Sequence, residues 1–183
     1  MMSKQLKKYS TERLDLIAAD LELVNAELNS INDLAKLLNA KVGNDWPPGE
    51  YDRGAQEYFK DQFIKYGEKI IGWQGWYAVK SETQNEPPIL IAAAGYFGPP
   101  SESGDIEIGF SVCPLYHGNG YATEIVNALI EIAGKDRRVK RIIARTTENN
   151  RASRKVLEKT GFQYVGFVDE DKILFEKMIF YTG

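Results

Sequence analysis

The stretch CPLYHGNGYAT, residues 113–123, joins a segment typical of a β-strand to one typical of an α-helix. The first N–H groups of a helix have no partner within the helix and carry roughly half a positive charge, so they attract phosphate. Gly118 and Gly120 let the main chain approach an anion with no Cβ in the way. The stretch therefore suits a pyrophosphate group, although a tight turn between strand and helix explains the two glycines equally well.

Two other phosphate-binding motifs do not fit this turn. A P-loop requires Lys and then Ser or Thr after its last glycine, where this chain has Tyr121 and Ala122. A dinucleotide-binding fingerprint requires Gly or Ala three residues after its second glycine, where this chain has Thr123.

The segments on either side of the turn predict a βαβ unit. Apolar residues recur with helical spacing from Ala122 to Ala133, and Gly134 ends the pattern. The strand DIEIGFSV (105–112) precedes this helix, and the strand VKRIIART (139–146) follows it. Two strands joined by such a crossover helix are expected to be parallel.

The rest of the chain adds further helices and strands to this unit. In chain order, the other expected elements are a strand at 11–18, helix at 21–38, a loop at 43–52, a helix at 55–66, strands at 75–80 and 89–97, a helix at 150–160, and strands at 163–168 and 173–180. This order predicts an α+β fold with one mixed sheet of about seven strands and about four helices, in a single domain over residues 1–183.

Composition and charge narrow the class of protein. Hydrophobic residues make up 43% and charged residues 27% of the chain, as in a globular protein. The 26 acidic and 23 basic residues give a net charge of -3, so no overall positive field attracts nucleic acid or an anionic membrane. The apolar stretch Ile89–Phe97 is far shorter than the roughly 20 residues that span a bilayer.

The cellular location is expected to be the cytoplasm. The opening residues MMSKQLKKYS lack the apolar core of a signal peptide. Cys113 is the only cysteine, so the chain has no internal disulfide, and this thiol is expected to be buried and structural.

Three segments, in order along the chain, resemble the GNAT N-acetyltransferases. The opening TERLDL (11–16) is typical of the branch similar to the RimJ and RimL ribosomal-protein acetyltransferases. Residues 117–122 resemble the acetyl-CoA-binding signature, commonly Arg or Gln, two residues, Gly, one residue, then Gly or Ala; His117 departs from it at the first position. Asn150 and Ser153, before a helix that ends in Gly-Phe at 161–162, resemble the family's later segment.

The resemblance implies a GNAT fold in which two splayed parallel strands hold acetyl-CoA as co-substrate, with no metal. The residues expected to bind the pantetheine arm and the thioester through their main chains are Phe110, Ser111 and Val112. Those expected at the pyrophosphate are His117, Gly118, Asn119, Gly120, Tyr121 and Ala122. Asn150 is expected either to hydrogen-bond pantetheine, as in the family, or simply to cap its helix.

The resemblance also implies direct attack of an amine on the thioester, without a covalent enzyme intermediate. Glu107 is the expected base, because it alternates with apolar neighbours on its strand and related enzymes often carry a carboxylate there, with Asp105 in reserve. Ser153 is expected either to relay a proton to the leaving thiolate or to face solvent. Several relatives use as the acid a Tyr at the position of Leu157, so that form of the mechanism is missing.

The acceptor is expected to be a protein N-terminal amine or a small-molecule amine. Trp46, an aromatic residue of the expected loop, is predicted to line the acceptor pocket. No nucleic-acid or membrane partner is expected, and the protein is predicted to be a monomer or homodimer. Two other functions stay open: a non-catalytic acyl-CoA-binding regulatory module, with which His117 and Leu157 are compatible, and a nucleotide-binding protein.

Overall fold

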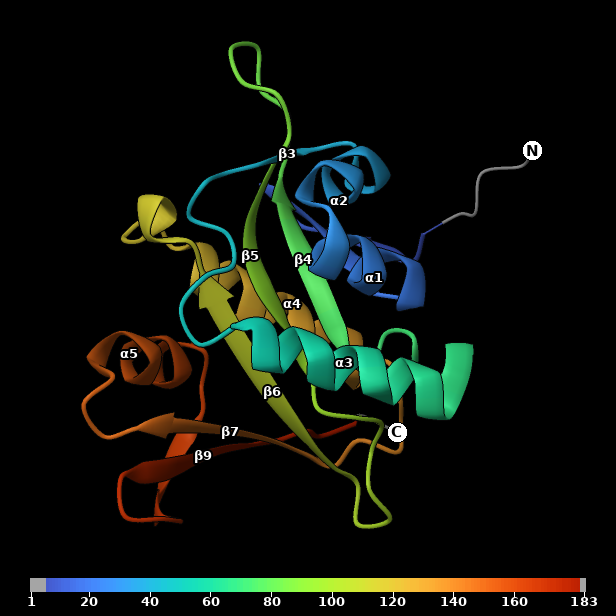
Figure 1. The fold of residues 1–183 in the computed structure, drawn as a ribbon. Coiled ribbons are helices and arrows are strands. Elements are labelled where there is room, and N and C mark those ends of the chain that lie inside the picture. The colour runs from blue at the N-terminus through green and yellow to red at the C-terminus, as the bar shows by residue number, and fades with distance from the viewer. Residues whose placement is uncertain (1–5, 182–183) are drawn as a thin grey trace.

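The computed structural model describes residues 6–181, which form one nine-stranded mixed sheet with helices on both faces (Figure 1). The opening residues 1–5, part of the segment expected to lack a signal-peptide core, lie outside the described residues. The strand order is β1-β2-β4-β5-β6-β7-β9-β8, and β3 pairs with β5. The strands are β1 (Lys8–Ser10), β2 (Leu14–Ala18), β3 (Lys41–Val42), β4 (Gly75–Lys80), β5 (Ile89–Tyr96), β6 (Asp105–Val112), β7 (Arg141–Thr147), β8 (Gln163–Phe167) and β9 (Lys172–Met178).

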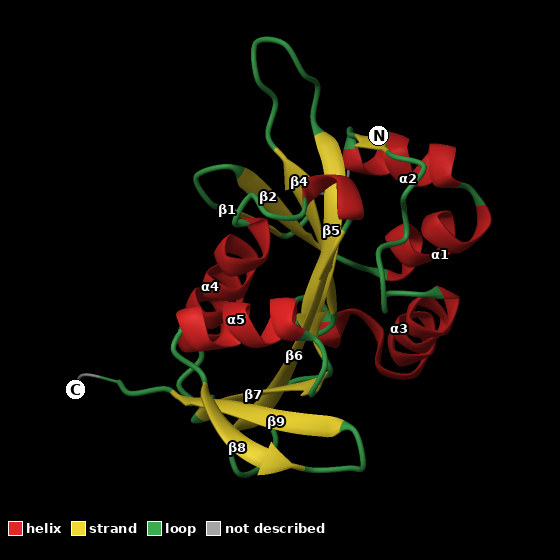
Figure 2. Ribbon diagram, turned by 90° about the vertical axis from the view of Figure 1, so that its left-hand side faces the viewer, coloured by secondary structure: helices red, strands yellow, loops and turns green. Residues whose placement is uncertain are grey.

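Helices cover the two faces of the sheet unequally. They are α1 (Leu21–Asn29), α2 (Ile31–Leu38), α3 (Arg53–Tyr66), α4 (Tyr121–Gly134) and α5 (Arg151–Lys159). Figure 2 shows α4 and α5 on one side of the sheet and α1, α2 and α3 on the other. The predicted α+β fold with one mixed sheet is confirmed, and no helix within residues 6–181 is long and apolar enough to cross a membrane.

The structure has more elements than the sequence predicts, because short elements carry little periodic signal. The strands β1 and β3 have only three and two residues. The predicted helix at 21–38 is divided at Ser30, whose backbone is extended and whose hydroxyl accepts the N–H of Asp33. A Ser side chain that caps a helix start in this way competes with continuation of the preceding helix.

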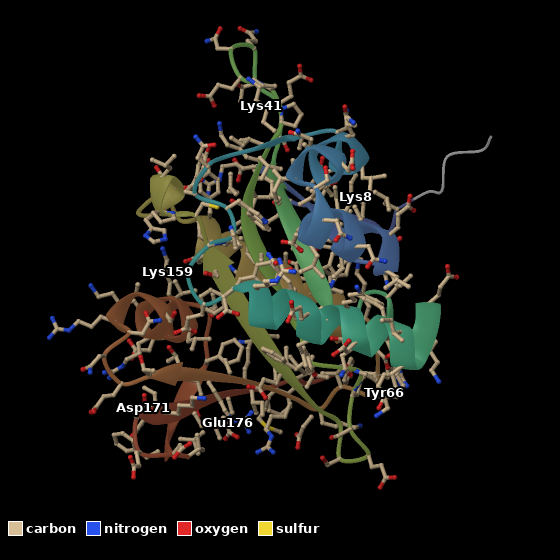
Figure 3. The ribbon with its side chains drawn as sticks, in the orientation of Figure 1. Lys8, Lys41, Tyr66, Lys159, Asp171 and Glu176 are labelled. Atoms are coloured by element: carbon tan, nitrogen blue, oxygen red, sulfur yellow. The ribbon has the colours of Figure 1, made fainter. Side chains whose placement is uncertain are left out.

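Each face of the sheet has its own hydrophobic core, and side chains fill the space between the sheet and the helix layers (Figure 3). Ile125, Val126 and Leu129 of α4 are 0% exposed and belong to the same cluster as Ile108 of β6. The opposite cluster contains Val24 of α1, Leu34 of α2 and Phe63 of α3. The central strands are therefore held from both sides.

The parallel strands β6 and β7 part halfway along β6. Their pairing runs from Asp105↔Arg141 to Ile108↔Ala144 and goes no further. Beyond this point β6 pairs with β5 as far as Val112, whereas β7 pairs with β9 as far as Thr147. Figure 1 shows the two strands diverging, with α5 beside the opening. The predicted parallel pair and its splay are both present.

Candidate active site

The helix α4 begins at a glycine turn that leaves its first N–H groups accessible. Gly118 and Gly120 have φ values of 75° and 79°, in the left-handed region that favours glycine. Gly120 precedes α4 without any side-chain capping bond. A Cβ at Gly118 would meet no atom within 4 Å, so the space in front of the turn is open. The helix start is therefore available to an anion.

The opening segment of the chain holds this turn from outside. Arg13 donates through Nη1 to the carbonyl of Asn119 at 2.9 Å, and its guanidinium lies over the ring of Tyr121 at 4.3 Å. Its Nε also donates to Glu124 at 2.7 Å. Burial opposes ionisation of Glu124, but hydrogen bonds from Thr11 and Arg13 outweigh it and hold the pKa of this carboxyl below its usual range. Residues 11–16 and residues 117–122, which both resemble segments of the family, therefore contact each other and form one structural unit.

His117 and Asn119 stabilise the inner side of the turn. His117 donates through Nε2 to the carbonyl of Val112 at 2.7 Å. Asn119 donates through Nδ2 to the carbonyls of Tyr116 and His117. His117 thus joins the end of β6 to the glycine turn, at the position where the family signature commonly has Arg or Gln.

A cavity of about 490 Å³ lies between the end of β6, the glycine turn and the start of α5. Every predicted cofactor-binding residue except Asn119 lines it, and so does Ser153. These lining residues are Phe110, Ser111, Val112, His117, Gly118, Gly120, Tyr121, Ala122 and Asn150. We refer to this space as the cofactor cavity.

Asn150 caps α5 and still presents its amide to the cofactor cavity. Its Oδ1 accepts the N–H of Ser153 at 3.1 Å, which is the N-cap arrangement. The Nδ2 group is then the part of this side chain left to donate to a ligand. The structural role of Asn150 is therefore present, and it is compatible with the expected contact to pantetheine.

The main chain of β6 points two N–H groups toward the opening between β6 and β7. The N–H group of Cys113 donates to the carbonyl of Ile91, and the carbonyl of Glu107 accepts the N–H of Phe97. The main-chain groups of Glu107 and Cys113 therefore face β5. Because main-chain direction alternates along an antiparallel pair, the N–H groups of Phe110 and Val112 point away from β5. These are the groups from which an oxyanion can receive hydrogen bonds.

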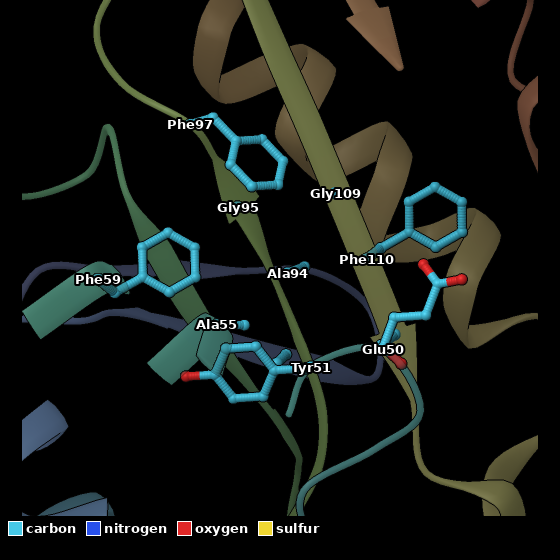
Figure 4. A pocket seen from close by; sticks show the side chains of 11 residues that line it. Glu50, Tyr51, Ala55, Phe59, Ala94, Gly95, Phe97, Gly109 and Phe110 are labelled. Carbon is cyan, nitrogen blue, oxygen red and sulfur yellow. The ribbon is translucent and has the colours of Figure 1, made fainter. Parts of the chain in front are cut away.

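A second cavity, of about 220 Å³, lies on the other side of β6. Figure 4 shows the rings of Tyr51, Phe59 and Phe97 around Ala94 and Gly95 of β5. The residues that line both cavities are Glu50, Phe110 and Ser111. We call this space the aromatic cavity; it meets the cofactor cavity at these residues.

The loop that carries Glu50 is fixed to β6 beside this junction. Ser111 donates through its hydroxyl to the carbonyl of Pro48 at 2.8 Å. A Cβ at Gly49 would lie only 2.7 Å from that hydroxyl oxygen, and Gly49 has a φ of 52°. A glycine at position 49 therefore permits the close approach that brings Glu50 to the parted strand.

A buried carboxylate anchors the wall of the aromatic cavity. Glu27 of α1 is 5% exposed and accepts hydrogen bonds from Trp46 Nε1, Tyr51 Oη, Gln56 Nε2 and Tyr77 Oη at 2.6–3.0 Å. Burial raises the pKa of the Glu27 carboxyl, although the four hydrogen bonds lower it in part. Together they tie the loop, α3 and β4 to α1. The ring of Tyr51 faces the cavity while its hydroxyl is held behind the wall.

The structure places Trp46 and the two predicted bases outside both cavities. Trp46 is 8% exposed and donates to Glu27, so it supports Tyr51 from the core. Glu107 accepts a hydrogen bond from Arg145. Asp105 is paired with Arg141 at 2.8 and 2.9 Å, and hydrogen bonding to this guanidinium lowers the pKa of its carboxyl.

Cys113 and Leu157 are both core residues, each 1% exposed. Burial raises the pKa of the Cys113 thiol to about 12, so it is protonated at neutral pH. The predicted burial of this thiol is confirmed. Among the described residues, no three His, Cys, Asp or Glu side chains are grouped as metal ligands would be.

Glu50, Tyr51 and Glu27 are residues that sequence reasoning does not connect with the site. The only sequence signal at Glu50 is its position after Pro-Pro-Gly, which marks a turn. Glu27 lies three residues after Val24, on the apolar side of its helix, and a carboxylate in such a position requires buried donors. Neither signal identifies the partners, because these come from distant parts of the chain.

A parallel strand pair that parts beside an uncapped helix start, with a second cavity across the parted strand, is the arrangement that the sequence resemblance implies for an acyl-CoA-dependent acetyltransferase. Comparison with known proteins agrees with this geometry. A family model described as an acetyltransferase (GNAT) domain matches residues 18–163. The uncharacterized N-acetyltransferase YjdG of Bacillus subtilis (strain 168) is 33% identical over 152 residues, which are 83% of this chain and 87% of that protein. The chain therefore belongs to the GNAT acetyltransferase family.

Solved structures show the same fold at low sequence identity. The ribosomal-protein-S5-alanine acetyltransferase of Vibrio fischeri has a TM-score of 0.65 at 20% identity, over 94% of this chain and 96% of that chain. RimL, a ribosomal L7/L12 alpha-N-protein acetyltransferase in complex with coenzyme A, has a TM-score of 0.64 at 17% identity, over 94% and 98%. The predicted GNAT fold is confirmed, and the solved structures that share it include RimL and a second ribosomal-protein acetyltransferase.

Proposed function

We propose that this protein transfers an acetyl group from acetyl-CoA to a primary amine by direct attack. One observation carries the proposal: the cofactor cavity and the aromatic cavity meet at Glu50, Phe110 and Ser111. A thioester in one cavity and an amine in the other can therefore come into contact only at this junction. Holding two reactants in such a geometry supplies a large part of catalysis by acyl transfer.

The cofactor cavity matches the parts of acetyl-CoA in order. The diphosphate binds the main-chain N–H groups of residues 118–122, at the start of α4. The pantetheine arm passes between β6 and β7 and accepts a hydrogen bond from the amide of Asn150. The thioester carbonyl then lies at the N–H groups of Phe110 and Val112, which stabilise the negative charge that forms on its oxygen.

The reaction exchanges one bond to the acetyl carbon for another. The amine nitrogen forms a bond to the thioester carbon, the bond from that carbon to sulfur breaks, and CoA leaves as the thiolate. Before attack, the ammonium form of the acceptor loses one proton to a carboxylate or to water. The nitrogen loses a second proton to solvent as the amide forms, and the thiolate takes a proton that Ser153 can relay from solvent. Ser153 lines the cofactor cavity, which supports this role.

Glu50 is the carboxylate that the geometry supports as proton acceptor. It lines both cavities and is exposed on its outer side, so it can return the proton to water. Glu107, the base expected from the sequence, is paired with Arg145 and lines neither cavity. Glu107 would have to act at a distance, through water.

The proposed acceptors are a protein N-terminal α-amine and a small-molecule amine. Two structural relatives are described as ribosomal-protein acetyltransferases, which supports the first of these.

The test combines binding with turnover on the purified full chain. Isothermal titration with acetyl-CoA measures affinity, and release of CoA thiol is followed with a panel of peptide and small amines. We expect binding of acetyl-CoA and release that depends on both acetyl-CoA and an amine. Binding without turnover on any amine would instead identify the non-catalytic regulatory module. ATP that displaced acetyl-CoA would favour a nucleotide-binding protein.

A further inference from the structure

The interior of the aromatic cavity is apolar although polar side chains line it. The Tyr51 hydroxyl donates a hydrogen bond to the Glu27 carboxylate, and the Ser111 hydroxyl donates one to the carbonyl of Pro48. Neither hydroxyl is therefore directed to a ligand. Tyr51 therefore presents its ring, together with Phe59 and Phe97. Phe59 and Phe97 are stacked, with ring centroids 6.3 Å apart and planes at 26°. The walls match a hydrophobic group.

The floor of the cavity is made of residues with little or no side chain. Ala93, Ala94 and Gly95 come from β5, and Gly109 comes from β6. A Cβ at Gly109 would lie 3.1 Å from Phe97 Cε2, and a Cβ at Gly95 would lie 2.3 Å from the carbonyl oxygen of Gln74. The Gly95 contact reflects close packing against the main chain of Gln74, whereas the Gly109 contact lies in the wall of the cavity. The space therefore depends on the absence of a side chain at Gly109.

The volume suits one compact side chain. An apolar cavity of roughly 150 Å³ holds a benzene ring, and this cavity has about 220 Å³. A Leu, Ile or Phe side chain therefore fits, whereas a longer chain would have to leave through the junction.

The charge distribution orients the ligand. Glu50 carries the carboxylate among the lining residues, and Figure 4 shows this carboxylate beside Phe110, at the junction with the cofactor cavity. An ammonium group is stabilised there by the carboxylate and, at short range, by ring faces. A second ammonium group or a carboxylate deeper in the cavity would lose its hydration without gaining a partner.

We propose that the aromatic cavity binds an apolar side chain on the carbon next to the acceptor amine. The substrate class is then a primary amine with an adjacent aliphatic or aromatic group, either free or at the N-terminus of a peptide, with its ammonium at Glu50. This inference rests on the proposed acetyl transfer and narrows its acceptor.

Relative rates on matched acceptors test the inference. The acceptors are the amides of Phe, Leu, Ala, Lys and Asp, and tripeptides that begin with the same residues, with kcat/KM measured for each. We expect Phe and Leu amides to exceed Ala amide by at least about 10-fold, the scale of one or two methylene groups in an apolar pocket, and Lys and Asp amides to fall below Ala. Comparison of amides with tripeptides separates a free amine from a peptide N-terminus.

A cavity-filling variant tests whether this cavity is the cause. Ala55→Leu adds apolar volume at a lining position on α3, and we expect the ratio of kcat/KM for Phe amide to that for Ala amide to fall about 10-fold. Ala35→Leu makes the same change at a half-buried position of α2 outside both cavities and should keep the wild-type ratio. If Ala55→Leu proves unstable, Phe97→Ala, at a residue that is 50% exposed, should reduce the ratio at least about threefold.

The outcomes separate this inference from the proposed function. Equal rates on Phe and Ala amides, or a preference for Lys or Asp amides, would overturn the inference and leave acetyl transfer intact. An unchanged ratio in both Ala55→Leu and Phe97→Ala would also overturn it. Failure to acetylate any amine would overturn the proposed function itself.

Discussion

The two cavities that meet at β6 are built in different ways. The cofactor cavity is lined largely by one contiguous stretch, residues 110–123, which contains the glycine turn and the start of α4; residues 49–50 and residues at the start of α5 complete it. The aromatic cavity is formed by side chains from the loop after β3, from α3 and from two strands. Main-chain recognition needs glycine and a helix start, whereas side-chain recognition can change without disturbing the fold. The comparison teaches why the cofactor is easier to infer than the acceptor.

The two cavities also differ in how they are supported. The glycine turn is held by the partly exposed pair of Arg13 and Glu124, with 41% and 16% of their side-chain surfaces exposed. The aromatic wall is held by Glu27, which is buried with four hydrogen-bond donors. Loss of Glu27 should therefore lower the free energy of unfolding more than loss of the Arg13–Glu124 pair, because a buried donor without an acceptor is destabilising.

The largest effect is expected from Glu27→Leu. It leaves the four donors around position 27 without their acceptor, and we expect the free energy of unfolding to fall by about 3 kcal/mol. Chemical denaturation measures this. Glu22→Leu, at an exposed position of the same helix, should cost less than about 1 kcal/mol. Similar losses in the two variants would contradict the assigned role of the buried network.

Glu50→Gln should lower kcat by about 100-fold, the lower range for removal of a general base. The pH dependence of kcat should flatten at the same time, while affinity for acetyl-CoA stays close to wild type. Glu107→Gln is the matched change at the base expected from the sequence, and its effect should be below about threefold. A larger loss in Glu107→Gln than in Glu50→Gln would return the role of base to Glu107.

Gly120→Val should weaken acetyl-CoA binding by about 10-fold. A branched side chain disfavours the left-handed backbone at this position by roughly 1–2 kcal/mol and narrows the approach to the helix start. Gly134→Ala, at the other end of α4, adds a Cβ that meets no atom within 4 Å and should bind normally. Calorimetric affinities of both variants decide whether the turn holds the diphosphate.

The smallest effect concerns pH and the buried carboxyl. The pKa of Glu27 is raised above its ordinary 4.5 in the folded state, so the folded protein binds this proton more tightly than the unfolded chain does. The contribution of Glu27 is therefore complete below pH 4.5 and declines as pH rises through the folded-state pKa. Glu27→Gln should remove this decline, so its stability relative to wild type should increase with pH. If the free energies of unfolding of Glu27→Gln and wild type differed by the same amount at pH 4 and pH 8, the raised pKa of Glu27 would be contradicted.

Much of the fold and one of the two cavities can be predicted from the sequence. The helix α4 has a regular apolar period, and its flanking strands identify a parallel pair. The short strands β1 and β3 carry too few residues for a pattern. The break at Ser30 depends on a cap that competes with helix continuation. Local sequence thus predicts the cofactor side because the groups that form it are consecutive.

The acceptor side could not be predicted because its parts come together only in the folded chain. Glu50 lies near Phe110 through a loop held by Ser111, a contact that spans 63 positions between Pro48 and Ser111. Trp46 is predicted to line the pocket, yet its indole N–H is better satisfied by buried Glu27. Trp46 is therefore buried because Glu27 accepts its indole N–H, and the spacing of residues along the sequence does not reveal that partner.

A crystal structure with a bisubstrate ligand tests the central claim most directly. The ligand is CoA joined through a two-carbon bridge to the amine of phenylalaninamide. The account predicts that its diphosphate contacts the N–H groups of residues 118–122, its bridge lies between Phe110 and Glu50, and its ring enters the aromatic cavity. A diphosphate bound away from this turn, or a bridge outside the junction of the two cavities, would contradict the account.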